Sequence, residues 1–428
     1  MSLLTKKSPI ERTEIFAALD IGTTKICCAI AKIDKRSFAS SLETPTLLKV
    51  IGVGQQLSRG LRAGNIVDLE ALEDSILNAV HSAEQASGQS INSVYVNLPG
   101  ISGRSKIIRS EIQLFNAPVD DSHLRRLLSY NQSAPETNDR QVIHVLPLSY
   151  TLDTTQGIRD PRGMVGEKLS ALLHVVSAPI NLIRNIKSCI GKCHLDISGF
   201  VASGYASGLS TLVEDELELG VTVIDMGGGT TTIASFCEGN LTYLSSFPLG
   251  GANITNDIAR GLATPLAHAE RLKNLYGTLV PSQSDDRESI LVSQMGEIDQ
   301  SHAHQVPKGM LTHIIKARVE EIAELIVKSL KESTGDSLTN QRIVLTGGAS
   351  QMQGLRELVM QALGKQVRLG APVGLVGSSD IINNPTFSTC AGLLQYGLQD
   401  RTSNHTMLPK SKFPTWQRFG LWLRESFE

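Results

Sequence analysis

The sequence predicts an α/β protein of two similar domains, with a smaller α+β unit inserted into the chain. The length of 428 residues is too great for one hydrophobic core and suits roughly two to four domains. Hydrophobic residues make up 41% of the chain and charged residues 19%, which is the composition of an ordinary folded protein. One strand–turn–strand pattern occurs twice, as ALDIGTTKI and VIDMGGGTTTI, with Asp225 standing 205 residues after Asp20. This repetition indicates two similar domains whose functional turns face each other.

Charge and apolar content exclude several classes of protein. Forty basic and forty-two acidic side chains leave a net charge of −2, so the chain has no overall attraction to nucleic acid. No apolar run approaches the roughly 18 residues of a membrane span, and no secretory signal opens the sequence. The six cysteines include Cys27 and Cys28 inside an apolar run, which indicates buried, reduced thiols. We therefore expect a cytoplasmic protein that does not bind nucleic acid.

The first half of the chain predicts a hairpin, a helix and an inserted unit. FAALDIGTTKICCAIAKID predicts two strands joined by a tight turn, and apolar residues at helical spacing predict a helix over 68–86. Three β-rich runs, VYVNL, KIIRSEIQL and VIHVLPLSYTL, then surround the helix-like DDSHLRRLLSY. The order strand, strand, helix, strand predicts the α+β insert.

The second half begins with a helix over 181–193 and the second hairpin. The polar stretch 281–309 is expected to be a loop. Apolar residues at 311, 315, 319, 322, 326 and 330 predict a long helix after it. The strand IVLTGG and a helix starting near Gln351 follow.

These patterns divide the chain into domains. The first domain comprises 14–86 and 166–205 together with 365–400, the insert comprises 87–165, and the second domain comprises 206–364. A flexible linker over 401–414 and an amphipathic helix over 415–428 complete the chain.

The repeated turns have the chemistry of a phosphate site. Glycine lets backbone N–H groups approach an anion closely, and threonine hydroxyls add donors to phosphate oxygens. An aspartate beside a polyphosphate implies Mg²⁺, which prefers carboxylate, water and phosphate oxygens. A single turn of this kind is equally typical of an ordinary hairpin, but two copies followed by the turn LTGGASQM favour a nucleotide clamped between domains. No G-x-x-x-x-G-K-[ST] pattern is present, which excludes a P-loop.

At these three turns the chain resembles a known superfamily. LDIGTTK, IDMGGGTT and VLTGGAS are similar to the nucleotide signatures of the actin–sugar kinase–heat-shock chaperone superfamily, and most similar to those of the FtsA family of bacterial cell-division proteins. The resemblance extends to the insert, to PLGGANITNDIA, to AERLK and to the terminal amphipathic segment. It implies a two-lobed actin-like fold, that is, a duplicated ribonuclease H-like fold, with the insert acting as an interaction subdomain.

The resemblance also implies ATP and Mg²⁺ as ligands and assigns residues to them. The first phosphate loop is Gly22, Thr23, Thr24 and Lys25, and the second is Gly227, Gly228, Gly229 and Thr230. Asp20 and Asp225 hold Mg²⁺ through water. Gly347, Gly348 and Ala349 approach the nucleoside, and Glu270 and Lys273 contact its ribose or adenine side. Without the resemblance, Glu270 and Lys273 would be interpreted as a surface ion pair of about 0.2–0.5 kcal/mol.

The segment VASGYASGL departs from the superfamily. Many members have an acidic residue here that orients the attacking water, whereas this chain has Ser203 and Gly204. Neither side chain can act as a carboxylate base, so we expect ATP binding with slow or negligible hydrolysis. No catalytic residue is assigned.

The last fourteen residues predict a membrane-targeting helix. On a helical wheel, Trp416, Phe419, Trp422, Leu423 and Phe427 share one face, while Arg418 and Arg424 lie opposite and favour an anionic membrane surface. The alternative is a terminal helix docked on the protein itself, but the preceding linker favours the membrane.

The family likeness implies a role in the cell. It implies an actin-like protein that forms filaments on the cytoplasmic face of the inner membrane at the division site. There it would bind the C-terminal tail of the tubulin-like protein FtsZ, anchor FtsZ to the membrane, and recruit later division proteins. The alternatives are a pilus-assembly adaptor similar to PilM and a small-molecule kinase of the same superfamily. A chaperone ATPase is disfavoured because only about 30 residues follow Gln399.

Other clusters have simpler interpretations. Cys189, Cys193 and His194 could suggest a metal site, but Cys189 and Cys193 lie one helical turn apart beside isoleucines, which favours a buried core. His302, His304 and His313 have no nearby Cys or acidic ligand that would complete a site.

Overall fold

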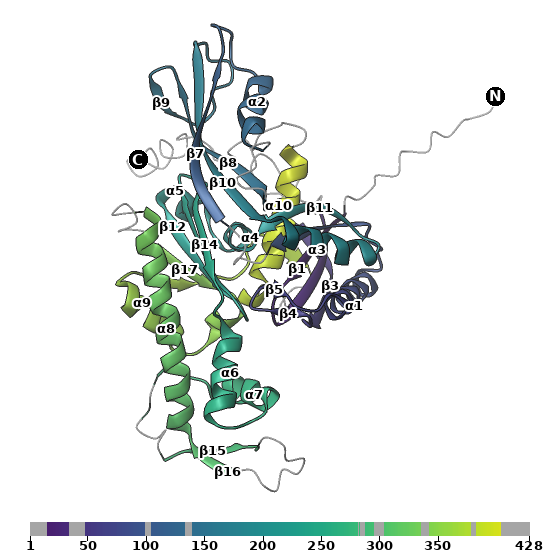
Figure 1. Ribbon diagram of the computed structural model, residues 1–428, viewed down its shortest axis with the longest axis vertical. Coiled ribbons are helices and arrows are strands. Elements are labelled where there is room, and N and C mark those ends of the chain that lie inside the picture. Colours follow the sequence, from purple (N-terminus) through teal and green to yellow (C-terminus); the bar gives the residue numbers. More distant parts are fainter. Residues whose placement is uncertain are drawn as a thin grey trace, which may run out of the picture.

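The computed structural model describes residues 15–33, 48–98, 104–132, 139–280, 282, 287–294, 304–334, 342–377 and 382–403. Two α/β lobes lie side by side, and a smaller sheet projects from the end where they meet (Figure 1).

The first lobe is built on a six-stranded sheet with the order β11-β6-β1-β2-β3-β19. The strands are β1 (Ile15–Ile21), β2 (Lys25–Ile33), β3 (Leu48–Leu57), β6 (Ser93–Leu98), β11 (Asp196–Ala202) and β19 (Leu375–Gly377). β1 and β2 are buried over most of their length, as their apolar sequences require.

The second lobe repeats this plan in a five-stranded sheet with the order β14-β13-β12-β17-β18. The strands are β12 (Val221–Met226), β13 (Thr231–Cys237), β14 (Asn240–Phe247), β17 (Arg342–Thr346) and β18 (Val367–Leu369). Asp20 lies opposite Cys27 in the first hairpin, and Asp225 lies opposite Thr232 in the second. Asp225 follows Asp20 by 205 positions, and Thr232 follows Cys27 by the same number. The predicted duplication is confirmed down to the strand register.

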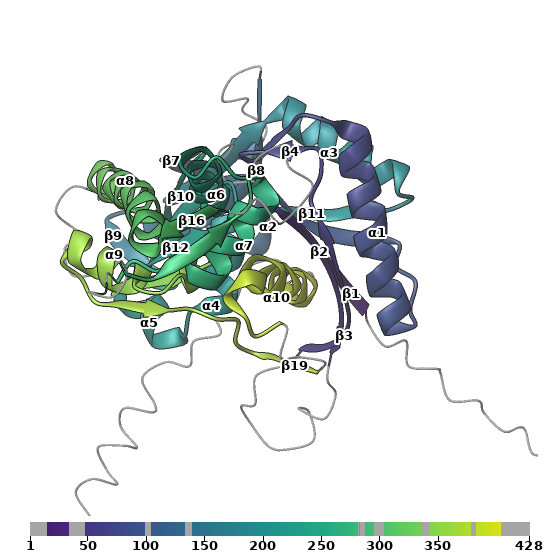
Figure 2. The ribbon, with the colours of Figure 1, turned by 90° about the horizontal axis from the view of Figure 1, so that it is seen from below.

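Helices cover both sheets and fill the space between them. α1 (Leu69–Ser87) and α3 (Ile180–Lys192) pack on the outer face of the first sheet. α6 (Gly251–Gly261), α7 (Leu266–Tyr276), α8 (Lys308–Thr334) and α9 (Leu355–Leu363) share a core with the second. α4 (Ser203–Thr211) and α10 (Ser388–Ser403) lie between the two sheets (Figure 2). The short α5 (Glu214–Leu219) precedes β12.

The inserted unit is a four-stranded sheet, β7-β10-β8-β9, with one helix. Its elements are β7 (Arg104–Gln113), α2 (Asp121–Gln132), β8 (Arg140–Leu152), β9 (Thr155–Ile158) and β10 (Lys168–Pro179). Leu124 and Leu127 of α2 pack against Leu169 and Leu173 of β10 in a separate small core. The insert is thus α+β, as expected.

Its limits differ from the expected range 87–165 at both ends. β6 pairs in parallel with β1 and β11 and belongs to the first sheet, whereas β10, beyond residue 165, is the central partner of β7 and β8. An alternating pattern identifies a strand but not its partner, and these partners are distant in the sequence.

Other expected segments also differ. The stretch 281–309 contains the hairpin β15 (Ser289–Val292) and β16 (His304–Pro307), with Ile290 and Val306 paired and buried. β18 belongs to the second sheet although 365–400 was expected in the first domain. α10 continues to Ser403, past the expected start of the linker at 401. A short 3₁₀ turn, Gly348–Gln351, precedes α9, so the helix begins later than expected.

The two short strands β4 (Leu61–Arg62) and β5 (Asn65–Ile66) form a small hairpin after β3. No helix among the described residues is long and apolar enough to span a bilayer.

Candidate nucleotide site between the lobes

The two predicted phosphate loops have the same backbone geometry. In the first, Gly22 N–H donates to Lys25 O at 3.0 Å; in the second, Gly227 N–H donates to Thr230 O at 2.9 Å. Each bond closes the tight turn of its hairpin, directly after the strand that ends near Asp20 or Asp225. The duplication therefore places two equivalent loops at the same ends of the two sheets.

The loops meet face to face where the two lobes come together. A Cβ atom at Gly228 would overlap the side chain of Thr24, and one at Gly229 would lie 2.5 Å from Thr23 Oγ1. Only glycine fits at these two positions while the loops are this close. The arrangement is a cradle of backbone N–H groups and hydroxyls contributed by both lobes.

Neighbouring segments hold each loop from behind. Gly251 N–H and Ala252 N–H, at the start of α6, donate to the carbonyl oxygens of Gly227 and Gly228. Gly64 N–H donates to Thr23 Oγ1 at 3.1 Å. Because the Thr23 oxygen accepts this bond, the hydroxyl hydrogen is available to an anion.

Two buried carboxylates lie at the base of the cradle. Burial raises the pKa of Asp20 to about 7, although the Lys25 ammonium lowers it; the nearby Asp225 carboxylate raises it further. Burial also raises the pKa of Asp225, against hydrogen bonds from Ser207 and Thr389 that lower it. Two like charges buried this close destabilise each other, and a cation between them would relieve that repulsion.

The oxygen ligands in this site fit Mg²⁺. Asp20 and Asp225 would hold the ion through water molecules, and a bound nucleotide would supply phosphate oxygens. Within the described part of the chain, no cluster of three or more His, Cys, Asp or Glu side chains is arranged to hold a metal by itself.

Lys25 is held at the edge of the loop. Its Nζ donates to Thr386 O at 2.9 Å and lies 3.6 Å from the ring centre of Phe387. These contacts tie the first phosphate loop to the segment that leads into α10.

Glu270 and Lys273 lie beside the start of α6, next to the second phosphate loop, and are more than a surface pair. Lys273 Nζ, whose side chain is 12% exposed, bonds Glu270 Oε2 at 2.6 Å, Thr255 Oγ1 at 2.9 Å and Gly251 O at 3.2 Å. Burial alone would raise the pKa of Glu270, but the bonds from Lys273 and Thr255 outweigh it and lower this pKa.

The third turn approaches the same region. A Cβ atom at Gly251 would lie 3.5 Å from Ala349 Cβ and 3.6 Å from Lys273 Nζ, so these residues converge. Gly347 has a φ of +88°, and a Cβ there would overlap Asp225 Oδ1. Glycine is required at 347 because of both its backbone conformation and this carboxylate. Gly348 follows at the start of the 3₁₀ turn.

Ser203 and Gly204 take part in packing beneath the first loop. Ser203 Oγ donates to Leu98 O at 2.8 Å and accepts from Asn97 Nδ2 at 3.3 Å. Asn97 Oδ1 in turn accepts from Ile21 N–H at 2.7 Å. A Cβ at Gly204 would lie 2.6 Å from Thr232 Cγ2.

Several residues of the site were not predicted from the sequence. Asn97, Ser207, Thr255 and Thr389 each bond a predicted loop, carboxylate or charged side chain. Thr255 lies inside PLGGANITNDIA and Ser207 inside VASGYASGL, and both could have been found from those stretches. Asn97 and Thr389 are brought to the site by distant packing.

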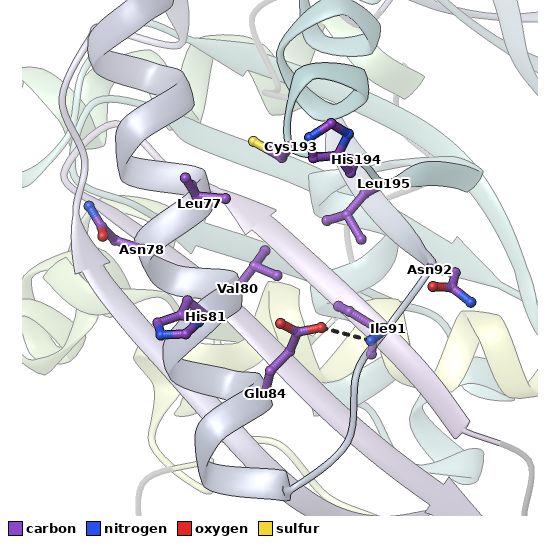
Figure 3. Close-up of a pocket in the computed structure, with 10 residues that line it drawn as sticks. All are labelled: Leu77, Asn78, Val80, His81, Glu84, Ile91, Asn92, Cys193, His194 and Leu195. Atoms are coloured by element: carbon purple, nitrogen blue, oxygen red, sulfur yellow. Dashed lines mark hydrogen bonds between the residues drawn. The ribbon is translucent and has the colours of Figure 1, made fainter.

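The cysteine and histidine cluster lies elsewhere. A cavity of about 470 Å³ between α1 and the turn after α3 is lined by Cys193, His194 and Glu84, on the outer side of the first sheet (Figure 3). The thiols of Cys189 and Cys193 are directed to backbone carbonyls of α1 and its start. These contacts agree with the expected buried core. His304 is in β16 and His313 in α8, while His302 lies outside the described residues.

The membrane-facing residues predicted at the C-terminus also lie outside the described residues. These are Trp416, Arg418, Phe419, Trp422, Leu423, Arg424 and Phe427.

Two duplicated lobes whose hairpin turns face each other, together with an inserted subdomain, define a protein of the actin-like class. Among solved structures, a chain of a PilM–PilN type IV pilus biogenesis complex has this fold, with 15% identity, a TM-score of 0.63 and coverage of 90% of this chain and 98% of its own. MreB5 of Spiroplasma citri bound to ADP is also similar, with 13% identity, a TM-score of 0.52 and coverage of 92% and 98%. At these identities the likeness concerns the fold alone.

The chain belongs to the FtsA family of cell-division proteins. The family model described as cell division protein FtsA matches residues 222–392, and that of the SHS2 domain inserted in FtsA matches 100–177. The cell division protein FtsA of Rhizobium meliloti is 39% identical over 99% of this chain and 97% of its own length. The FtsA proteins of Pseudomonas aeruginosa and Escherichia coli K12 are 32% and 30% identical, over 98% and 97% of this chain and 99% and 98% of their own lengths. The protein is therefore an actin-like protein of cell division, and the SHS2 match covers the sheet from β7 to β10.

Proposed function

We propose that this FtsA-family protein binds Mg-ATP in the cleft, assembles into filaments on the cytoplasmic face of the inner membrane at the division site, and there anchors FtsZ. The observation that carries the proposal is the contact of Gly228 with Thr24, which brings the phosphate loops of both lobes to one point. A ligand with a polyphosphate chain would bind both loops at once and join the lobes.

Small residues and a carboxylate beside the second phosphate loop favour a nucleoside over a simple polyphosphate. Gly251 and Ala349 lie close together without bulky side chains, and the Glu270 side chain, which is 47% exposed, supplies an acceptor beside them. A ribose hydroxyl can donate to this carboxylate. The relative bound to ADP, MreB5, shares the fold and is consistent with this assignment.

We propose further that ATP is held and turned over slowly. The Ser203 hydroxyl is committed to Leu98 O and Asn97, and Gly204 is packed against Thr232. Neither Ser203 nor Gly204 thus supplies a carboxylate or a free side chain that could activate water. ATP then serves to hold a lobe arrangement that favours filament assembly.

Membrane attachment is assigned to the segment 415–428. Five large apolar side chains at about 1.5–3 kcal/mol each give an upper limit of roughly 7–15 kcal/mol, which partial insertion and helix ordering reduce. One such helix binds reversibly, whereas linked copies in a filament bind by avidity. Filament assembly and membrane binding are therefore coupled.

Partner binding is assigned to the two ends of the molecule. The end of the second lobe exposes Leu266, Leu275 and Leu291 on α7 and β15, which suits the apolar part of an FtsZ C-terminal tail. The insert exposes Phe115 and Val165 at its tip, which suits later division proteins.

Co-sedimentation with anionic liposomes tests the proposal. The full chain and a chain ending at Pro414 are each mixed with phosphatidylglycerol-containing vesicles, with and without Mg-ATP. We expect the full chain to pellet, ATP to increase the pelleted fraction, and the truncation to remain in solution. A full chain that stays in solution in both conditions would contradict the membrane assignment, and pelleting that ATP does not change would contradict the coupling to nucleotide.

A further inference from the structure

Two hydroxyl groups hold the carboxylate of Asp225 from the side away from Gly347. Thr389 Oγ1 donates to Asp225 Oδ2 at 3.1 Å, and Ser207 Oγ donates to the same oxygen. The two hydroxyls lie 3.0 Å apart, but each has a single hydrogen, and both hydrogens are used on the carboxylate. All three side chains are buried. The carboxylate therefore has a fixed orientation, with Oδ2 toward the hydroxyls and Oδ1 toward Gly347 in the cleft.

The two hydroxyls come from different helices. Ser207 lies on α4 and Thr389 lies on α10, 182 residues later in the chain. The helices cross so closely that a Cβ at Gly392 would overlap the carbonyl oxygen of Ala206, and Ser210 Oγ donates to Ser388 O at 2.7 Å beside the crossing. α10 packs on β1 of the first lobe and α4 on β12 of the second, between the sheets (Figures 1 and 2). The orientation of Asp225 thus depends on how the two helices pack between the lobes.

We propose that Ser207 and Thr389 are positioning residues that orient Asp225 toward the hydration shell of the nucleotide-bound Mg²⁺ and make Mg²⁺ binding depend on the crossing of α4 and α10. This inference rests on the proposed binding of Mg-ATP in the cleft. Side chains that orient a metal ligand typically contribute about 10–100-fold to metal affinity. ATP bound without Mg²⁺ does not use the Asp225 carboxylate, so its affinity does not depend on Ser207 and Thr389.

Calorimetric titration of ATP, in excess MgCl₂ and in EDTA, tests the proposal on the full-length protein. The measured quantity is the ratio of the two dissociation constants, which gives the factor by which Mg²⁺ tightens ATP binding. The variants are Thr389→Val, which removes the hydroxyl at nearly constant volume, and Thr389→Ser, which keeps it. Thr312→Val is the matched control, since Thr312 is buried in α8 and its hydroxyl has no partner among the described residues.

We expect Thr389→Val to lower the Mg²⁺ factor about tenfold while the affinity in EDTA changes less than threefold. Thr389→Ser and Thr312→Val keep the wild-type factor. An unchanged factor in Thr389→Val, or equal losses in MgCl₂ and EDTA, would overturn the proposal, because a hydroxyl that only supports packing acts on both alike. Absence of ATP binding by the wild-type protein would instead overturn the proposed function on which the inference rests.

Discussion

Gly228 of the second lobe lies directly against Thr24 of the first, so close that a Cβ atom on the glycine would overlap the threonine side chain. The neighbouring pair, Gly229 and Thr23, has the same relation. The two loops come from hairpins of identical register in separate sheets. Closure of the cleft at this point therefore depends on the absence of side chains in the second loop.

Substitution of Gly228 by valine should hold the loops apart. We expect the affinity for Mg-ATP, measured by calorimetry, to fall at least tenfold, because the phosphates can then contact only one loop at a time. The matched control is Gly191→Ala in α3, where an added Cβ meets nothing within 4 Å. This control should bind ATP like the wild type and be slightly more stable to heat. Wild-type affinity in Gly228→Val would show that the loops do not act together.

Removal of the Lys273 ammonium should weaken nucleotide binding without changing the contacts between the protein and the phosphates. We expect Lys273→Met to lower the affinities for ATP and ADP by the same factor, about tenfold, because Lys273 holds Gly251 and Glu270, which contact the nucleoside under the proposed binding mode. Lys192→Met is the control, since Lys192 forms an exposed ion pair with Glu73 on the outer side of the first lobe. Equal affinities in wild type and Lys273→Met would place the nucleoside elsewhere.

The pair Arg368 and Glu216 should stabilise the second lobe. Arg368 bonds both carboxylate oxygens of the buried Glu216 at 2.6 and 2.5 Å, and also Thr211 O at 2.8 Å. Arg368→Met leaves the carboxylate buried without its partner, and we expect the free energy of unfolding in urea to fall by about 2–3 kcal/mol. Arg356→Met, which breaks the exposed pair with Glu357, should change it by less than about 0.5 kcal/mol. A similar small loss in both variants would mean that the buried pair adds no stability.

The buried histidines of the insert should make stability depend on pH. Burial lowers the pKa of His144 to about 4, with a further contribution from His174, and burial lowers the pKa of His174 to about 4. In the unfolded chain both titrate near the ordinary value of 6.5, so the unfolded state binds more protons between pH 6.5 and 4. Stability is therefore complete above pH 6.5 and is lost as the pH falls toward 4, by about 2 kcal/mol for each histidine between pH 7 and 5.

His174→Leu isolates one of these contributions. Neither ring nitrogen of His174 has a hydrogen-bond partner among the described residues, so the substitution should also raise the free energy of unfolding at pH 7 by about 1 kcal/mol or more. Urea denaturation at pH 7 and pH 5 should show a smaller pH dependence than the wild type. His81→Gln, at an exposed position of α1, should keep the wild-type dependence. An unchanged pH dependence in His174→Leu would contradict the assignment.

Local patterns predicted the duplicated hairpins and the positions of their turns. Asp20 and Asp225 occupy the same place before the turn in each hairpin. This predicted the same register for both hairpins, because the turn residues leave one way to pair the strands. The long helix α8 was also predicted, since Leu311, Ile315, Val319 and Ile322 are buried along one face.

Features that depend on distant pairing could not be predicted in this way. β6 and β10 have similar apolar sequences, yet one joins the first sheet and the other the insert. The Ser207–Asp225–Thr389 contact joins residues 18 and 164 positions apart, through two helices whose crossing has no sequence signature. The residues that orient the site thus come from tertiary packing, whereas the loops come from local sequence.

Hydrogen–deuterium exchange on the full-length protein, with and without Mg-ATP, tests most directly whether the nucleotide is held between the lobes. The account predicts that Mg-ATP slows amide exchange in peptides covering 22–25, 227–230 and 347–349 together, because one ligand contacts all three turns. Protection confined to the turns of one lobe, or absent from both phosphate loops, would contradict it.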